Sequence, residues 1–171
     1  MKLREAMHGD LGAVTAIYAH HVHTGLASFE TDAPDVAEMR QRHEAVVAKG
    51  FPYLVAEVDG QVAGYAYASH YRPRFAYRFT CEDSIYVDPR YAGRGVGRAL
   101  LEALVEECAR RGYRQMIAVI GDSGNAASIG LHRACGFELT GTFKSIGYKH
   151  GRWVDSVLMQ RTMGAGDASP P

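Results

Sequence analysis

The stretch from Val87 to Leu101, VDPRYAGRGVGRALL, determines the fold. It follows FTCEDSIYV (residues 79–87), a run rich in aromatic and β-branched residues that predicts a strand. It leads into a helix over Gly95–Arg111, in which Leu100, Leu104 and Cys108 share one apolar face. A strand, a glycine-rich turn and an amphipathic helix in this order predict an α/β domain, with the turn at the helix N-terminus.

The glycine-rich turn has two interpretations. Glycine lets the backbone approach a ligand closely, and a helix N-terminus favours negative charge, so the turn can form a cradle for a pyrophosphate. The alternative is an ordinary surface loop with solvated arginines. The sequence lacks the Gly-Lys-Ser/Thr of a P-loop, and the turn comes too late in the chain for a Rossmann fingerprint. The cradle interpretation uses Gly93, Arg94, Gly95, Val96, Gly97 and Arg98.

Elsewhere in the chain, strand and helix patterns alternate. Asp10 is placed to cap a first helix from Leu11, and Thr31 and Asp32 to cap a second, which ends near Ala48. Asp59-Gly60 predicts a tight hairpin between two strands. Further predicted elements are a strand over 2–6, a strand over 116–120, a helix over 125–134, and strands over 137–143 and 153–160. This order predicts a mixed sheet with helices on both faces.

Composition excludes several classes of protein. The 171 residues are 47% hydrophobic, and nineteen basic residues balance nineteen acidic ones, so no global field attracts nucleic acid or membranes. We expect one domain over 1–162 and a disordered tail over 163–171. The N-terminus has no apolar signal core, and no stretch approaches a membrane span, so a cytoplasmic location is expected. The three cysteines fit neither a disulfide framework nor a metal site.

The motifs resemble those of a known family. VDPRYAGRGVGRALL is similar to the acetyl-CoA pyrophosphate loop of the GNAT N-acetyltransferases, and GNAASIGLHRACGFELTGTF (residues 124–143) to their second cofactor segment. The resemblance covers residues 2–159, and SFETDAP, YRPRFAYRFTCEDSIYV and GYKHGRWVDSVLMQR resemble the phosphinothricin and methionine sulfoximine N-acetyltransferase group. It implies an α/β (α+β) GNAT fold with six to seven strands, about four helices and a splayed central strand pair.

Two positions depart from the family pattern. Ala92 stands where a cationic or amide side chain usually begins the pyrophosphate loop, so main-chain amides, Arg94 and Arg98 are expected to hold the anion. A second register beginning at Arg90 is also possible, although the following leucines favour the first. His132 stands where many members have a tyrosine that protonates the departing thiolate, and the phosphinothricin group also has histidine there.

The reaction implied is direct attack of an amine on the thioester of acetyl-CoA, which requires a base and a site for the oxyanion. Glu82 is the expected general base, and His132 a thiolate acid or substrate ligand. By themselves, Glu82 could be an exposed strand-end acid and His132 a packing residue. For the cofactor the resemblance implies main-chain groups of Ile85, Tyr86 and Val87, with Val87 holding the oxyanion. It also implies Asn125, which is equally an ordinary helix cap, and Ser128.

The acceptor site is expected to bind a carboxylate. Arg72 and Arg74 cluster with aromatic residues just before Glu82, and arginine forks suit carboxylate oxygens. A single-stranded nucleic-acid patch is the weaker interpretation, because the cluster is short and the net charge is zero. The other expected substrate residues are Phe29, Thr31, Asp83 and Ser84.

Three functions follow: acetylation of a small amino-acid analogue, acetylation of a peptide or another amine, or non-catalytic binding of CoA. The first is preferred, and the resemblance adds a homodimer. It also implies that a late hairpin approaches the site near the dimer interface, although this aromatic hairpin edge could equally be plain core; its residues are Tyr148, Lys149, His150 and Trp153. No metal is expected. His20, His21 and His23 lack the spacing to surround one ion and are interpreted as solvated.

Overall fold

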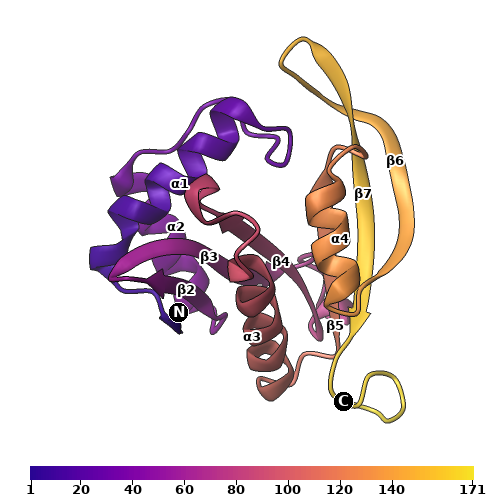
Figure 1. Cartoon of the computed structure of the whole chain (residues 1–171). Helices are drawn as coiled ribbons and strands as arrows, with labels where there is room; N and C mark the ends of the chain where they lie inside the picture. Colours follow the sequence, from indigo (N-terminus) through magenta and orange to yellow (C-terminus); the bar gives the residue numbers. More distant parts are fainter.

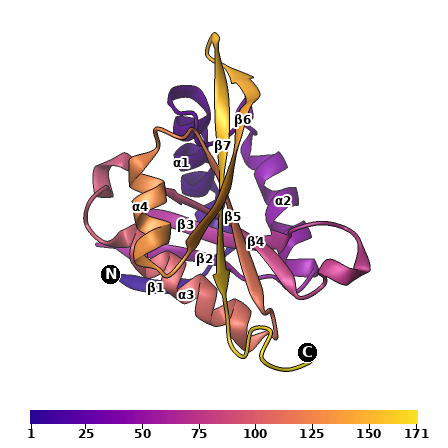
Figure 2. The ribbon, with the colours of Figure 1, turned by 90° about the vertical axis from the view of Figure 1, so that its right-hand side faces the viewer.

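A computed structural model describes all 171 residues, Met1–Pro171. Seven strands form one sheet in the order β1-β2-β3-β4-β5-β7-β6, with four α-helices (Figures 1 and 2). The elements are β1 (Lys2–Glu5), α1 (Leu11–Thr24), α2 (Val36–Ala48), β2 (Tyr53–Val58), β3 (Gln61–His70), β4 (Thr80–Val87), α3 (Val96–Arg110), β5 (Gln115–Gly121), α4 (Ala126–Ala134), β6 (Glu138–Lys149) and β7 (Arg152–Thr162). The expected mixed sheet and four helices are confirmed.

Two hydrophobic cores lie on opposite faces of the sheet. Leu100, Leu101 and Leu104 of α3 pack in the larger core against β2–β5 and β7. Helices α1 and α2 cover the other face, where Val14 and Met39 belong to the smaller core together with inward-facing tyrosines of β2 and β3. Because side chains alternate along a strand, each central strand contributes to both cores.

Local signals predicted some element ends correctly and others wrongly. Asp59 and Gly60 both have positive φ, at 50° and 76°, as the predicted tight hairpin requires. Asp10 precedes α1 but does not cap it, because its carboxylate accepts from both terminal nitrogens of Arg4, at 2.6 and 2.8 Å. The cap of α2 is Asp35, which accepts from the Glu38 amide, and not Thr31 or Asp32.

The sheet divides between β4 and β5. These strands pair in parallel only at Thr80–Gln115, Cys81–Met116 and Glu82–Ile117, and both then continue without pairing. The result is a gap in the middle of the sheet, with β1–β4 on one side and β5, β7 and β6 on the other (Figure 1). This is the expected splayed strand pair.

Hydrogen bonding to β3 determines which backbone groups of β4 face the gap. The Asp88 amide donates to Ala63, and in an antiparallel ladder every second residue makes such bonds, so Tyr86 pairs with Tyr65. The main-chain groups of Ile85 and Val87 therefore point toward the gap, whereas those of Tyr86 belong to the ladder.

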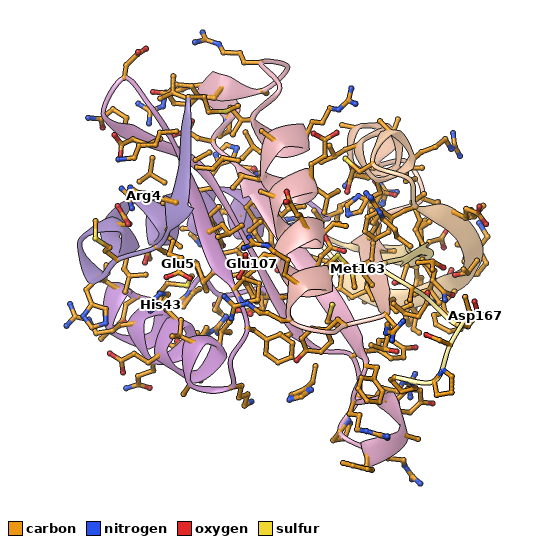
Figure 3. All side chains as sticks on the ribbon, turned by 90° about the horizontal axis from the view of Figure 1, so that it is seen from below. Arg4, Glu5, His43, Glu107, Met163 and Asp167 are labelled. Atoms are coloured by element: carbon orange, nitrogen blue, oxygen red, sulfur yellow. The ribbon has the colours of Figure 1, made fainter.

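The C-terminal segment contains no helix or strand after Thr162. Met163 is buried in the larger core, and Figure 3 labels it where the pale yellow segment that leads to Asp167 begins. Turns follow from residue 164. None of the helices has the length and apolar character needed to cross a membrane.

Candidate active site

A groove of about 840 Å³ lies between the N-termini of α3 and α4. The turn before α3 forms one wall, and Gly93 and Gly95 there have φ of 73° and 79°, which favour glycine. Ala99 donates the first bond inside α3, to Gly95, so the preceding amides of Val96, Gly97 and Arg98 have no partner within the helix. A helix N-terminus with free amides is an anion site.

The arginines of this turn differ in position. Arg98 lines the groove, and its Nε donates to Glu102 at 2.8 Å. Arg94 does not line the groove, because its guanidinium lies over the ring of Tyr91, 5.5 Å from the centroid. Anion binding here therefore depends first on main-chain amides.

A second cavity, of about 510 Å³, occupies the gap between β4 and β5. It is continuous with the groove, because both are lined by Ile85, Tyr86, Asn125, Ser128 and Ala27. Asn125 also caps α4 by accepting from the Ser128 amide at 3.1 Å. A ligand with an anionic end in the groove can thus place its other end in the gap.

Glu82 lines the cavity at the last paired position of β4. Burial, and then the neighbouring charge of Asp83, raise the pKa of Glu82 to about 7. A carboxylate with this pKa can accept a proton near neutral pH. Ser84 and Tyr86 follow on the same face of β4, and Tyr86 packs in the smaller core.

Asp83 points to the opposite face and meets α4. Its Oδ2 lies 3.0 Å from Nε2 of His132, and Nδ1 of His132 donates to the Ser128 carbonyl at 2.8 Å. Burial lowers the pKa of His132, but the hydrogen bond and charge of Asp83 and the Ser128 carbonyl outweigh this effect and raise it. Both side chains line the cavity.

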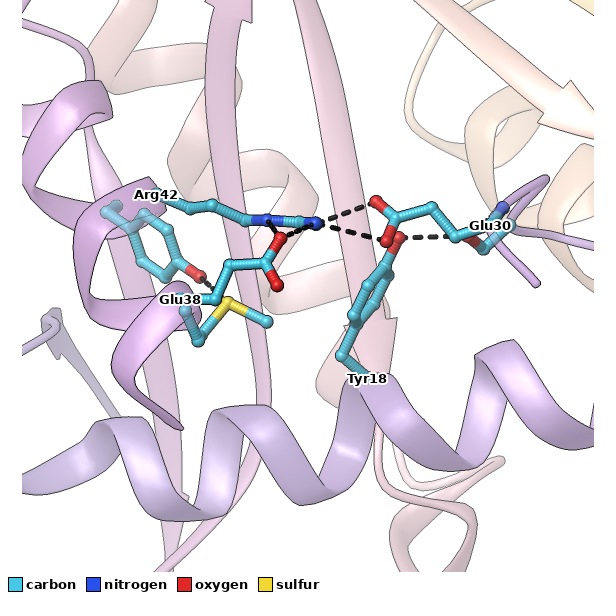
Figure 4. Close-up of polar contacts among 7 residues, drawn as sticks. Tyr18, Glu30, Glu38 and Arg42 are labelled. Carbon is cyan, nitrogen blue, oxygen red and sulfur yellow. Dashed lines mark hydrogen bonds and ion pairs between the residues drawn. The ribbon is translucent and has the colours of Figure 1, made fainter. Parts of the chain in front are cut away.

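The segment between α1 and α2 crosses the gap and is held by polar contacts. Ser28 exchanges a hydrogen bond with the Tyr18 hydroxyl at 2.9 Å, and its carbonyl accepts from the buried Lys149 ammonium at 2.6 Å. Arg42 of α2 donates to Glu30 at 2.7 Å, as Figure 4 shows. Ser28 and Glu30 both line the cavity, so these bonds shape its wall.

Two glycines permit this crossing. A Cβ on Gly121 of β5 would lie 2.2 Å from the Leu26 carbonyl oxygen and 2.9 Å from that of Ala27. A Cβ on Gly147 of β6 would lie 2.5 Å from the ring of Phe29. The Phe29 ring therefore reaches the cavity wall only because position 147 has no side chain.

The loop before α4 is attached to the β6–β7 hairpin by Asp155. Its carboxylate accepts from the Ser123 hydroxyl at 2.7 Å, the Ser145 amide at 2.9 Å and the Lys144 ammonium at 2.9 Å. These bonds, that of Ser123 foremost, lower the pKa of Asp155 to about 2. The loop that begins α4 is thus fixed to a neighbouring element.

Some predicted site residues lie elsewhere. Arg72 and Arg74 are exposed and line neither cavity; the segment between β3 and β4 that carries them, magenta in Figure 2, lies on the opposite side from α4. Thr31 is exposed and bonds to Asp32. Arg94 also lines neither cavity, and the remaining predicted residues line one of the two.

Two side chains at the site, His21 and Tyr18, were not predicted, and a third, Lys149, was expected near the site only from the resemblance. His21 was interpreted as solvated, but it is partly buried, lines the groove and donates from Nε2 to the Val87 carbonyl at 2.8 Å. Its spacing from Val14 and Tyr18 on α1 was the available signal. Tyr18 lines the cavity, and Lys149 holds its wall through a contact 121 residues away in the sequence.

Comparison with known proteins identifies the family, since residues 14–137 match the Acetyltransferase (GNAT) family. The chain belongs to the GNAT acetyltransferases. A phosphinothricin N-acetyltransferase of Alcaligenes faecalis is 60% identical over 162 residues, 95% of this chain and 82% of the relative. An L-methionine sulfoximine/L-methionine sulfone acetyltransferase of Pseudomonas paraeruginosa is 39% identical, over 98% of each chain.

Solved structures agree with this family assignment. The crystal structure of a GNAT superfamily phosphinothricin acetyltransferase from Sinorhizobium meliloti, in complex with acetyl-CoA, has a TM-score of 0.96 at 50% identity. The match covers 99% of this chain and 92% of that one. The expected family, fold and enzyme class are therefore confirmed: the chain is a GNAT acyltransferase. It has no group of three or more His, Cys, Asp or Glu side chains arranged to hold a metal ion.

Proposed function

We propose that this GNAT acetyltransferase transfers acetyl from acetyl-CoA to the α-amino group of a small amino-acid analogue of the phosphinothricin, methionine sulfoximine or methionine sulfone type. The observation that carries the proposal is the continuity of the anion-binding groove with a cavity that contains Glu82. The named relatives act on these substrates, and one solved relative holds acetyl-CoA.

The groove suits the donor substrate. The free amides before Ala99 and the side chain of Arg98 face the pyrophosphate, and Ile85 and Val87 offer main-chain groups to the pantetheine arm. His21 already occupies the Val87 carbonyl, so the Val87 amide is the group left to stabilise the oxyanion.

The cavity suits the chemistry of transfer. Glu82 accepts the proton of the attacking amine, directly or through water, since its pKa of about 7 makes the carboxylate available near neutral pH. The amine nitrogen then bonds to the thioester carbonyl carbon and gives the tetrahedral oxyanion. When this intermediate collapses, the carbonyl forms again, the C–S bond breaks and CoA leaves as its thiolate. Phe29 packs on the aliphatic part of the amino acid, and Ser84 lies beside it.

The test is a panel of amino-acid analogues with acetyl-CoA, followed by release of free thiol. We expect turnover on at least one of the three analogues and little on N-terminal peptides. Turnover confined to peptides or other amines would instead support the second expected function, acetylation of a peptide or another amine. Binding of acetyl-CoA without any turnover would make it a CoA-binding module.

We further propose that the enzyme is a cytoplasmic homodimer that gives resistance to such analogues. The β6–β7 hairpin extends beyond the rest of the chain (Figures 1 and 2), and Phe143, Ile146, Tyr148 and Trp153 there are at least half exposed. An exposed apolar surface of this kind favours a protein contact. Light scattering should give twice the chain mass, and Ile146→Lys should reduce it to the mass of one chain.

The test of resistance is expression of the enzyme in a bacterium sensitive to phosphinothricin, which should raise the tolerance of that bacterium.

A further inference from the structure

The buried pair of Asp83 and His132 carries an inference beyond the proposed function. The side chains are only 2% and 3% exposed, and they join β4 to α4 across the edge of the gap. The Ser128 carbonyl can only accept, so Nδ1 of His132 carries a hydrogen. Nε2 and Oδ2 of Asp83 then share one further proton at 3.0 Å.

This arrangement occupies both nitrogens of His132. Neither nitrogen is free to contact a ligand while the pair is intact, and the ring packs edge-on against Phe137. The other ionisable groups that interact with Asp83 are Glu82 and Cys81 on β4 and Cys135 at the end of α4. None of them is a cation, so His132 is the partner that can balance the negative charge of Asp83.

The second oxygen of Asp83 is left without a partner. Oδ1 is buried and makes no hydrogen bond within the protein, although Asp83 lines the cavity. An unpartnered buried carboxylate oxygen loses its hydration without gaining a hydrogen bond in return, so a functional reason is expected. A carboxylate oxygen only accepts, and the group it lacks is therefore a donor.

We propose that Oδ1 of Asp83 accepts a hydrogen bond from an N–H group of a bound substrate, and that His132 is the positioning residue that holds this carboxylate. The inference rests on the proposed function, which supplies two sources of such a group. One is the amino group of the acyl acceptor, and the other is an amide of the pantetheine arm of acetyl-CoA. In both cases Asp83 contacts the ligand and His132 acts through Asp83.

The decisive variant is Asp83→Asn, because it keeps the shape of the side chain. The amide oxygen can still accept from His132, and this places an NH₂ donor where Oδ1 was. We expect kcat/KM to fall about 10–100-fold for the substrate that supplies the N–H group, as loss of a hydrogen bond to a charged group predicts. Loss for the amine identifies the acceptor as the source, and loss for acetyl-CoA identifies pantetheine.

A matched control is Asp10→Asn, which removes another buried carboxylate, paired with Arg4 and remote from both cavities. It should lower the melting temperature without changing either kcat/KM. A role in stability alone would make Asp83→Asn behave in the same way, and that result would overturn the proposal.

Two measurements that do not depend on turnover complete the test. Nitrogen-15 NMR of the imidazoles should show both nitrogens of His132 protonated at pH 7, and both of these signals should be absent from His132→Gln. The same variant should reproduce the kinetic defect of Asp83→Asn. Calorimetry should measure acetyl-CoA affinity directly. If wild type uses no amino-acid analogue, the proposed substrate class fails; the inference fails separately if Asp83→Asn matches wild type in acetyl-CoA affinity and in kcat/KM for every amine that wild type uses.

Discussion

Gly121→Ala is expected to inactivate the enzyme while leaving it folded. The new Cβ would lie 2.2 Å from the Leu26 carbonyl oxygen, whereas a carbon–oxygen contact needs about 3.3 Å, so the crossing segment must move by about 1 Å. That segment carries Ser28 and Glu30 on the cavity wall. A displacement of about 1 Å near a reacting centre costs about 100-fold in rate, and overpacking costs about 1–3 kcal/mol of stability.

The assay compares kcat/KM from thiol release with the melting temperature for three glycine variants. Gly147→Ala displaces the Phe29 ring alone, so its loss of activity should be smaller. Gly130→Ala lies in α4 with nothing within 4 Å of the new Cβ, and it should keep full activity and raise the melting temperature by about 2–4 °C. Activity of Gly121→Ala equal to wild type would refute the assigned role of the crossing segment, and equal losses in all three variants would refute the ranking.

Three further predictions concern charged groups. For Glu82, kcat/KM should rise with pH through about 7 and then level off, and Glu82→Gln should abolish this rise. The Glu82 carboxyl binds its proton more tightly in the folded protein than in the unfolded chain, so its ionised form destabilises the fold. Glu82→Gln should therefore be more stable than wild type at pH 8. A pH profile unchanged by this substitution would remove Glu82 as the base. Arg98→Ala should weaken acetyl-CoA more than the amine, because Arg98 lines the groove, and equal losses would contradict this assignment. Asp155→Asn should lower the melting temperature at pH 7. The hydrogen bonds to Asp155 favour its ionised form, so the difference in melting temperature from wild type should shrink as pH falls from 3.8 toward about 2. A difference that stays constant with pH would exclude the ionic contribution.

Sequence reasoning predicted the features that depend on neighbouring residues. Asp59-Gly60 specifies its hairpin through backbone preferences, and the glycine-rich turn with its leucine stripe specifies the start of α3. The short apolar run over 116–120 was also predicted correctly as a strand, since it lies within β5.

Contacts between distant segments were not predictable in this way. Asp83 and His132 are 49 positions apart, and no local pattern shows that α4 brings them together. Asp10 has the residue type of a helix cap, but Arg4 on β1 offers a stronger charged partner. Arg72 and Arg74 form a clear charge cluster, yet the position of their loop depends on the whole sheet and lies away from the cavity.

The gap between β4 and β5 means that the sheet has an edge inside the molecule. Ile85 and Val87 turn main-chain groups toward this interior edge, and no strand of the chain pairs with them there. An extended donor substrate with amide groups can occupy that place as an added strand does in β-augmentation. The enzyme then becomes a complete sheet only in its loaded state, so amide hydrogen exchange at Ile85 and Val87 should slow when acetyl-CoA binds, and product release becomes the step that reopens the sheet.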